Sequence, residues 1–263
     1  MNFDYIPVWL LFAGTVALVI LSLEVGYRLG HRSRRKSEEG EKESPVGAIA
    51  GSVLGLVAFM MAFTFGIVAD RYDSRKSLVR EEANSIGTTW LRADFLPEAD
   101  RAEAKALLKE YVAERVRVTD DLRSGKLRPA EMGPLLAKAG QTHKRLWEMA
   151  VANARLDMNS DVAALYIDSL NGLIDLHATR VAVALQARIP AGIWAALLGL
   201  TFLGMVAVGY QVGIAGSKRS LAQPILAVSF SLVIALITTL DRPHGSYVKV
   251  SQQPFVDLLD SMD

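Results

Sequence analysis

The sequence predicts an all-α integral membrane protein with four transmembrane helices and a helical bundle inserted between the second and the third. Hydrophobic residues make up 51% of the 263-residue chain, and its mean hydropathy of +0.24 is too high for an ordinary soluble protein of this length. The apolar residues fall into four runs, each long enough to cross a bilayer. The long segment between the second and third runs has the spacing of helices and contains no pattern typical of strands.

The first run, Ile6 to Val25, is predicted to be a transmembrane helix within residues 1–30. No Lys or Arg precedes it and no small-residue cleavage pattern follows it, which argues against a signal peptide. Glu24 and Arg28 are four residues apart on one helical face, so they are expected to form an ion pair. Residues 31–45 are predicted to be a charged loop, basic and then acidic. A basic cluster beside a transmembrane helix is an ordinary topology signal, so it does not indicate nucleic-acid binding.

The chain is organised around one long helix, predicted from Pro45 to Leu96, because no proline or turn cluster interrupts this stretch before Pro97. Its uncharged part, residues 46–69, is the second transmembrane helix, and the remainder projects beyond the membrane. One face is apolar and suited to packing. The opposite face is small or polar apart from two phenylalanines. If several copies surrounded an axis, this face would line a pore with a hydrophobic constriction. These predicted pore-lining residues are Ser52, Gly55, Phe59, Phe63, Gly66, Asp70, Ser77, Glu81, Asn84 and Thr88. The alternative interpretation is that the glycines permit close helix packing in lipid and that the polar residues face solvent.

Residues 70–189 contain no further spanning run and are predicted to form the extramembrane bundle. After the projecting helix, a second helix is expected from Glu98 to Ser124 and is stopped by Gly125. Pro129 and Pro134 open a third helix, and a fourth runs from about residue 157 to residue 188. The four helices are expected to pack antiparallel.

The third transmembrane helix is predicted at residues 190–212 and the fourth at residues 221–240. Glycines at positions 192, 199, 204 and 209 suit tight contact between helices. The tail, residues 241–263, ends in a short amphipathic helix after Pro254, which is expected to dock on the bundle or on the membrane surface.

Lys and Arg are concentrated in the short loops after the first and third transmembrane helices. The positive-inside rule therefore predicts that these loops are cytoplasmic and that the bundle is extracytoplasmic. We expect a multi-pass protein of the inner (plasma) membrane, with the lipid bilayer as its first partner.

The sequence carries no catalytic signature, and we expect no enzyme activity and no cofactor. It has no cysteine, and its four histidines show no metal-ligand spacing, so no metal site is predicted. Lys plus Arg (29) nearly balances Asp plus Glu (28), so no nucleic-acid partner is expected. Apart from Glu24, the four spans contain no charged residue, which disfavours coupled proton transport. A stator-like proton channel would need a partner to supply the carboxylate.

Three stretches, residues 63–97, 169–190 and 240–258, resemble the hallmark segments of a bacterial family of unknown function called bestrophin-like membrane proteins. True bestrophins are pentameric anion channels whose second transmembrane helix carries a hydrophobic neck. The resemblance therefore implies an oligomeric channel, a pentamer, in which Phe59 and Phe63 stand where that neck falls. Anion selectivity rests on the resemblance alone, because Asp70 and Glu81 on the same face would favour cations.

Four charged residues of these stretches, Arg71, Glu82, Asp241 and Arg242, are predicted to form an interfacial network near the membrane surface. The leading functional hypothesis is an oligomeric bestrophin-like ion channel that conducts inorganic ions, with the second transmembrane helix lining the pore. The alternative is a membrane-anchored helical sensor or scaffold that acts through a partner.

Overall fold

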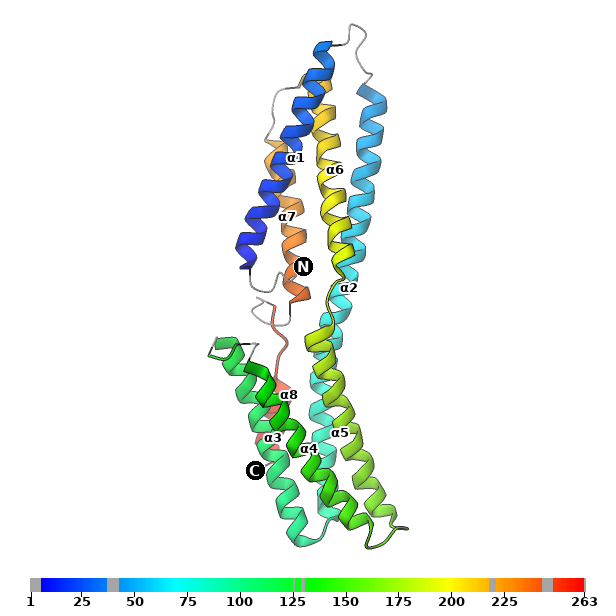
Figure 1. Ribbon diagram of the computed structural model, residues 1–263, viewed down its shortest axis with the longest axis vertical. Coiled ribbons are helices and arrows are strands. Elements are labelled where there is room, and N and C mark those ends of the chain that lie inside the picture. The colour runs from blue at the N-terminus through cyan, green and yellow to red at the C-terminus, as the bar shows by residue number, and fades with distance from the viewer. Residues whose placement is uncertain are drawn as a thin grey trace. The chain divides into compact units, whose positions relative to one another are not determined.

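The structure is a computed structural model that describes residues 6–36, 43–124, 126–128, 131–217, 221–242 and 248–262. Within these ranges it is all-helical, as predicted, and it contains no strand. The helices are α1 (Val8–Lys36), α2 (Glu43–Arg92), α3 (Glu98–Ser124), α4 (Met132–Ala154), α5 (Asp161–Gln186), α6 (Ala191–Ala215), α7 (Ala222–Asp241) and α8 (Gln253–Ser261). Four of them, α1, α2, α6 and α7, are long and apolar enough to cross a membrane, which confirms the four predicted spans. Figure 1 shows the order of the helices along the chain.

The chain divides into two compact units. The first contains residues 1–70 and 188–242, and the second contains residues 71–187 and 243–263. The 50-residue helix α2 contributes its apolar half to the first unit and its polar half to the second. It is a single helix because Pro45, its one proline, lies in the first turn, where the missing amide donor is tolerated.

In the first unit, α1 packs along α6 and also contacts α7. A seam of glycines lets the backbones of α1 and α6 touch. A Cβ atom on Gly26 would lie 2.0 Å from the carbonyl oxygen of Val206, and one on Gly209 would lie 2.1 Å from that of Leu23. Gly204 meets side chains of α2, whereas Gly192 and Gly199 have nothing within 4 Å. Only part of the predicted glycine set therefore serves close packing.

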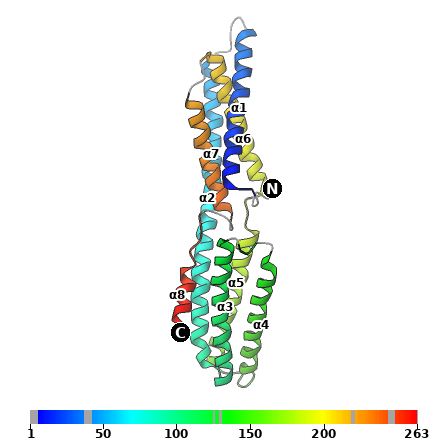
Figure 2. The same cartoon turned by 90° about the vertical axis from the view of Figure 1, so that its left-hand side faces the viewer.

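In the second unit, the polar half of α2 packs with α3, α4 and α5 around one apolar core (Figure 2). The short helix α8 contacts α3. The core has at its centre the fully buried side chains of Ile86, Leu108, Leu146 and Leu173. Phe255 of α8 is also fully buried there, so of the two docking sites expected for the tail helix, the bundle is the one it uses.

Several helix ends differ from the sequence expectation. The first helix continues to Lys36, through the first six residues of the stretch predicted to be a charged loop, because Arg and Lys are good helix formers and are favoured at a helix C-terminus. The long helix ends at Arg92 and is followed by a turn of 3₁₀ helix, Ala93–Phe95. The fourth bundle helix begins at Asp161, where the Ser160 side chain accepts a hydrogen bond from the Ala163 amide. Gly125 and Pro129 lie outside the described residues.

Candidate functional site

The predicted pore-lining stripe lies on the face of α2 that no other part of the described chain covers in its transmembrane half. Ser52 and Gly55 are exposed, and Phe59 and Phe63 are 65% and 55% exposed. The two phenylalanine rings lie one turn apart and stack, with their centroids 6.4 Å apart. Gly66, the next residue of the stripe, is half-buried.

The opposite face of α2 packs, as the spacing predicts. Val57, Met61 and Val68 are buried in the first unit. Phe65 lies on this face by its spacing from Met61 and Val68, yet it is 38% exposed while the neighbouring Thr64 is fully buried. The Thr64 hydroxyl donates to the carbonyl of Met60 at 2.7 Å, so its polar atom is satisfied within the helix and can be buried at low cost.

The polar half of the stripe is also largely open to solvent. Asp70, Glu81, Asn84 and Thr88 are exposed, and Ser77 is half-buried. The Ser77 hydroxyl donates to Oε1 of Glu81 at 2.6 Å. The stripe therefore presents two exposed carboxylates, Asp70 and Glu81, three turns apart along α2.

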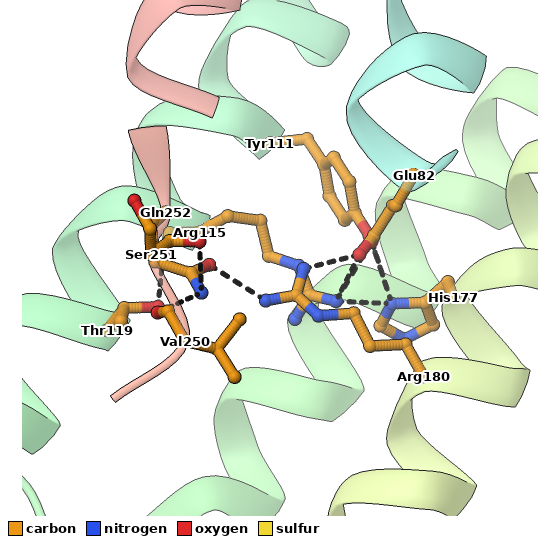
Figure 3. A network of polar contacts seen from close by, with 9 residues as sticks. All are labelled: Glu82, Tyr111, Arg115, Thr119, His177, Arg180, Val250, Ser251 and Gln252. Carbon is orange, nitrogen blue, oxygen red and sulfur yellow. Dashed lines mark hydrogen bonds and ion pairs between the residues drawn. The ribbon is translucent and has the colours of Figure 1, made fainter. Parts of the chain in front are cut away.

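A second polar site lies inside the second unit, around Glu82. This carboxylate has no exposed surface and receives contacts from α3 and α5 (Figure 3). The Tyr111 hydroxyl donates to Oε1 at 2.6 Å, and Arg115 Nη2 donates to the same oxygen at 2.9 Å. Arg180 Nη1 donates to Oε2. His177 Nδ1 lies 2.9 Å from the Tyr111 hydroxyl and 3.1 Å from Arg115 Nη2.

Two guanidinium groups hold the Glu82 carboxylate in its ionised form. Burial raises the pKa of Glu82, but the positive charge of Arg115, the interaction with His177, and the charge and hydrogen bond of Arg180 outweigh it and hold that pKa well below its usual range. Burial, together with the negative charge of Glu82, raises the pKa of Tyr111, so the phenol remains a hydrogen-bond donor. The site is therefore a charged network that is fully desolvated at Glu82.

The C-terminal segment joins this network through Arg180. Arg180 Nη2 donates to Oε1 of Gln252 at 3.0 Å, and its guanidinium lies over the Phe255 ring at 4.9 Å. Gln252 is 9% exposed and also donates to the Val250 carbonyl at 3.2 Å (Figure 3). The tail is thus attached by a buried aromatic ring and by the same arginine that neutralises Glu82.

His143 of α4 completes the cluster of rings. Its ring centroid lies 4.8 Å from that of His177 and 5.1 Å from that of Tyr111. The side chain is only 6% exposed, and burial is the main reason that its pKa falls to about 4. His143 is therefore neutral near pH 7.

The structure gives contacts for three of the four residues predicted to form one interfacial network. Glu82 is bound inside the second unit, 12 residues beyond Asp70 along α2. Asp241 accepts a hydrogen bond from the Ile189 amide at 3.1 Å, and Arg242 donates to the Ile6 carbonyl at 2.7 Å, both within the first unit. Arg71 is half-buried at the start of the second unit. Glu82 is fully buried, and the interfacial network of these four residues stays a prediction.

Sequence reasoning also missed Tyr111, Arg115, His143, His177 and Arg180 as members of one site. A signal was present: Glu82 lies on the apolar packing face between Val79 and Ile86, both of which are buried. A charged side chain in such a position requires a buried partner of opposite charge. The arginines on the inner faces of α3 and α5 were the residues to pair with it.

Among the described residues, no three His, Cys, Asp or Glu side chains are grouped so that they could hold a metal ion.

Comparisons with known proteins identify the family. A family model described as a bestrophin-like domain matches residues 13–255. Curated protein sequences give no match. One solved structure, a crystal structure of a membrane protein carrying a single substitution, is similar with a TM-score of 0.59 at 13% identity, covering 93% of this chain and 94% of that one. A point mutant of a bacterial bestrophin homolog from Klebsiella pneumoniae is similar with a TM-score of 0.54 at 15% identity, covering 94% and 97%.

At these identities the two structures show a shared fold, whereas the family model matches most of the chain. This membrane protein belongs to the bestrophin-like family.

Proposed function

We propose that this protein is an oligomeric ion channel in which the exposed stripe of α2 lines the conduction path. Phe59 and Phe63 form its hydrophobic constriction, and the second unit lies outside the bilayer as a helical bundle inserted between the second and third spans. The observation that carries the proposal is the composition of the face that α2 leaves open. Membership of the bestrophin-like family supports the same function.

The stripe of α2 that carries Phe59 and Phe63 is richer in small residues than the exposed surface of α7. On α7 the exposed residues include large aliphatic side chains such as Ile225 (66%) and Leu232 (57%), as expected for a surface in contact with lipid. On α2 the exposed positions before the phenylalanines include Gly51, Ser52 and Gly55, beside the exposed aliphatic residues Ile49 (62%) and Leu56 (47%). Small and polar residues suit contact with other helices or with water better than contact with lipid chains. Several copies of α2 around an axis would provide both kinds of contact, with neighbouring helices and with the water of a pore.

Two stacked phenylalanines suit a gate. A ring of such side chains narrows a pore and disfavours water within it, so ion flow depends on how far the rings are drawn apart. The family resemblance implies five copies in the ring.

The charges on the stripe bear on which ions would pass. Rings of Asp70 and Glu81 would attract cations, whereas the resemblance to bestrophins implies anions. Reversal potentials in asymmetric salt would distinguish the two, and neutralising both carboxylates by Asp70→Asn with Glu81→Gln would show whether these rings set the preference.

The proposed orientation in the inner membrane is supported by the basic end of α1, where Arg34, Arg35 and Lys36 form the last turn. The positive-inside rule places this end in the cytoplasm and the second unit on the other side. The chain has no cysteine, so single cysteines at Arg35 and at Leu156, which is 81% exposed, can be labelled selectively in whole cells. Labelling by an impermeant reagent is expected at position 156 and not at position 35.

Ion flux in liposomes tests the proposal directly. Replacing both Phe59 and Phe63 by Ala should raise the flux, because it removes the constriction. The matched control replaces Ile225 and Leu232, two exposed apolar residues of α7, by Ala and should leave the flux unchanged. If the double variant Phe59→Ala with Phe63→Ala still assembles as an oligomer and its flux is unchanged, the proposal is wrong.

A further inference from the structure

A groove between α3 and α4, in the second unit, has features of a binding site. Its floor and walls are largely apolar and include Val118, Met132, Leu135 and Leu136. Arg115, which binds Glu82 on its other side, contributes to the lining. The groove thus places an apolar surface beside the Arg115 side chain, which is 14% exposed.

One buried donor atom of Arg115 has no hydrogen-bond partner among the described residues. Its Nη2 atom contacts Glu82 and His177, but its Nε atom is buried and has no hydrogen-bond partner among the described residues. The Nε2 atom of His143 on α4 is likewise buried and without a partner in the described chain. An unsatisfied buried donor costs free energy, so Nε of Arg115 calls for an acceptor that binds there.

The net charge of the network also favours binding of an anion. Arg115 and Arg180 share one carboxylate, Glu82, so these three groups together carry one positive charge. The groove mouth does not change this balance. Its carboxylates, Glu110 and Glu114, are paired with Lys138 at 2.9 and 3.1 Å, and Glu114 is also paired with Arg117. A monovalent anion beside Arg115 would neutralise the interior of the unit.

The size of the groove limits the ligand. Its cavity volume is about 30 Å³, and because one water molecule needs ~10–15 Å³ of such volume, the space suits one small ion rather than a large metabolite. We propose that the groove between α3 and α4 binds a small monovalent anion, a short-chain carboxylate or a halide, which accepts a hydrogen bond from Nε of Arg115. The apolar wall would receive the alkyl end of a carboxylate.

Thermal unfolding of the purified full chain in a neutral detergent tests this site. Sodium acetate, sodium chloride and sodium gluconate are compared at equal ionic strength, with gluconate as an anion too bulky for the groove. A ligand that binds the folded state raises the unfolding midpoint in a saturable way. We expect acetate or chloride to raise it by several degrees relative to gluconate. A rise with acetate alone identifies a carboxylate site, and a rise with chloride alone identifies a halide site.

Two variants assign the effect to the groove. Arg115→Lys keeps the charge but removes Nε, and Leu136→Trp fills the groove without touching the network, so both should abolish the anion-specific rise. Leu156→Trp, at a position that is 81% exposed, is the control and should retain it. If Arg115→Lys does not fold, Leu136→Trp decides alone. Equal midpoints in the three salts, or a rise that survives Leu136→Trp, would overturn the proposal. Because no ion flux is measured, this outcome is independent of the proposed channel function.

Discussion

The Tyr111 hydroxyl of α3 donates a 2.6 Å hydrogen bond to Glu82 of α2, a carboxylate with no exposed surface. Two arginines on different helices bind the same carboxylate, Arg115 from α3 and Arg180 from α5. Three helices of the second unit therefore meet at one side chain. Stability, response to acid and attachment of the tail should all depend on it.

Replacing Glu82 by Ala should destabilise the second unit by about 3–5 kcal/mol, because it leaves two buried guanidinium groups without their counter-charge. Chemical denaturation followed by tryptophan fluorescence would measure the loss. The control is Glu81→Ala at the neighbouring exposed position, which should change stability by less than about 0.5 kcal/mol. A small effect at Glu82 would mean that the network contributes little to stability.

Acid should weaken the folded state through His143 before it affects Glu82. Burial lowers the pKa of His143 from 6.5 to about 4, so the unfolded chain binds this proton more readily than the folded one. This contribution is present above pH 6.5 and is lost as the pH falls toward 4. The two pKa values correspond to about 2 kcal/mol lost at pH 5. Glu82, whose pKa is depressed, adds a further loss at lower pH, below its ordinary value of about 4.3.

The variant His143→Gln separates these contributions, since it cannot titrate. The groups that face His143 are Tyr111 and Arg115 from α3, His177 from α5 and Glu82 from α2. Unfolding midpoints between pH 7.5 and 5 should fall less steeply in the variant than in the parent protein. Parallel profiles would assign the acid sensitivity to another group.

Phe255→Ala should release the tail helix from the second unit. The ring is fully buried and lies under the Arg180 guanidinium, so its removal should cost about 3–5 kcal/mol of the free energy that holds α8 in place. Amide hydrogen exchange should then be fast at residues 253–261 while α3 stays protected. Asp260→Ala, at an exposed position of the same helix, is the control and should leave exchange unchanged. Simultaneous loss of protection in α3 would show that α8 does not unfold separately from the rest of the second unit.

Gly209→Val should prevent α1 and α6 from packing. A Cβ atom there would lie 2.1 Å from the Leu23 carbonyl oxygen, so the backbones would have to separate. Gly14→Val is the matched control, because nothing lies within 4 Å of the Cβ position at Gly14. Thermal stability in detergent should fall for the first variant and change little for the second. Equal effects would indicate a general cost of valine in these helices.

The sequence contained enough to predict the helices but not their contacts. Hydropathy and the absence of helix breakers predicted the four spans and the uninterrupted α2, since length and apolar content alone decide them. The bounds of α3, Glu98–Ser124, were also predicted, because Pro97 precedes them and Gly125 follows. The helical turns at Arg32 to Lys36 were missed because a run of charge was taken to indicate a loop, although Arg and Lys are compatible with either.

The candidate sites differ in how much the sequence revealed. Helical periodicity predicted the stripe on α2, because periodicity is a property of one helix, and the structure leaves Phe59 and Phe63 exposed. The Glu82 network joins residues up to 98 positions apart, and no single-helix pattern encodes which arginine reaches it. Glu82 itself was singled out, but its partners depend on how the helices pack.

The two helices that meet at the glycine seam, α1 and α6, are synthesised at different times. α1 ends at Lys36 and its seam partner α6 begins at Ala191, so about 150 residues are translated between them. At typical rates of about 5–20 residues per second, α1 waits on the order of ten seconds in the bilayer before its partner emerges. During that interval its one intramembrane carboxylate, Glu24, has Arg28 within its own helix at 2.7 Å. The first span carries its own counter-ion and can be inserted before the helix against which it finally packs exists.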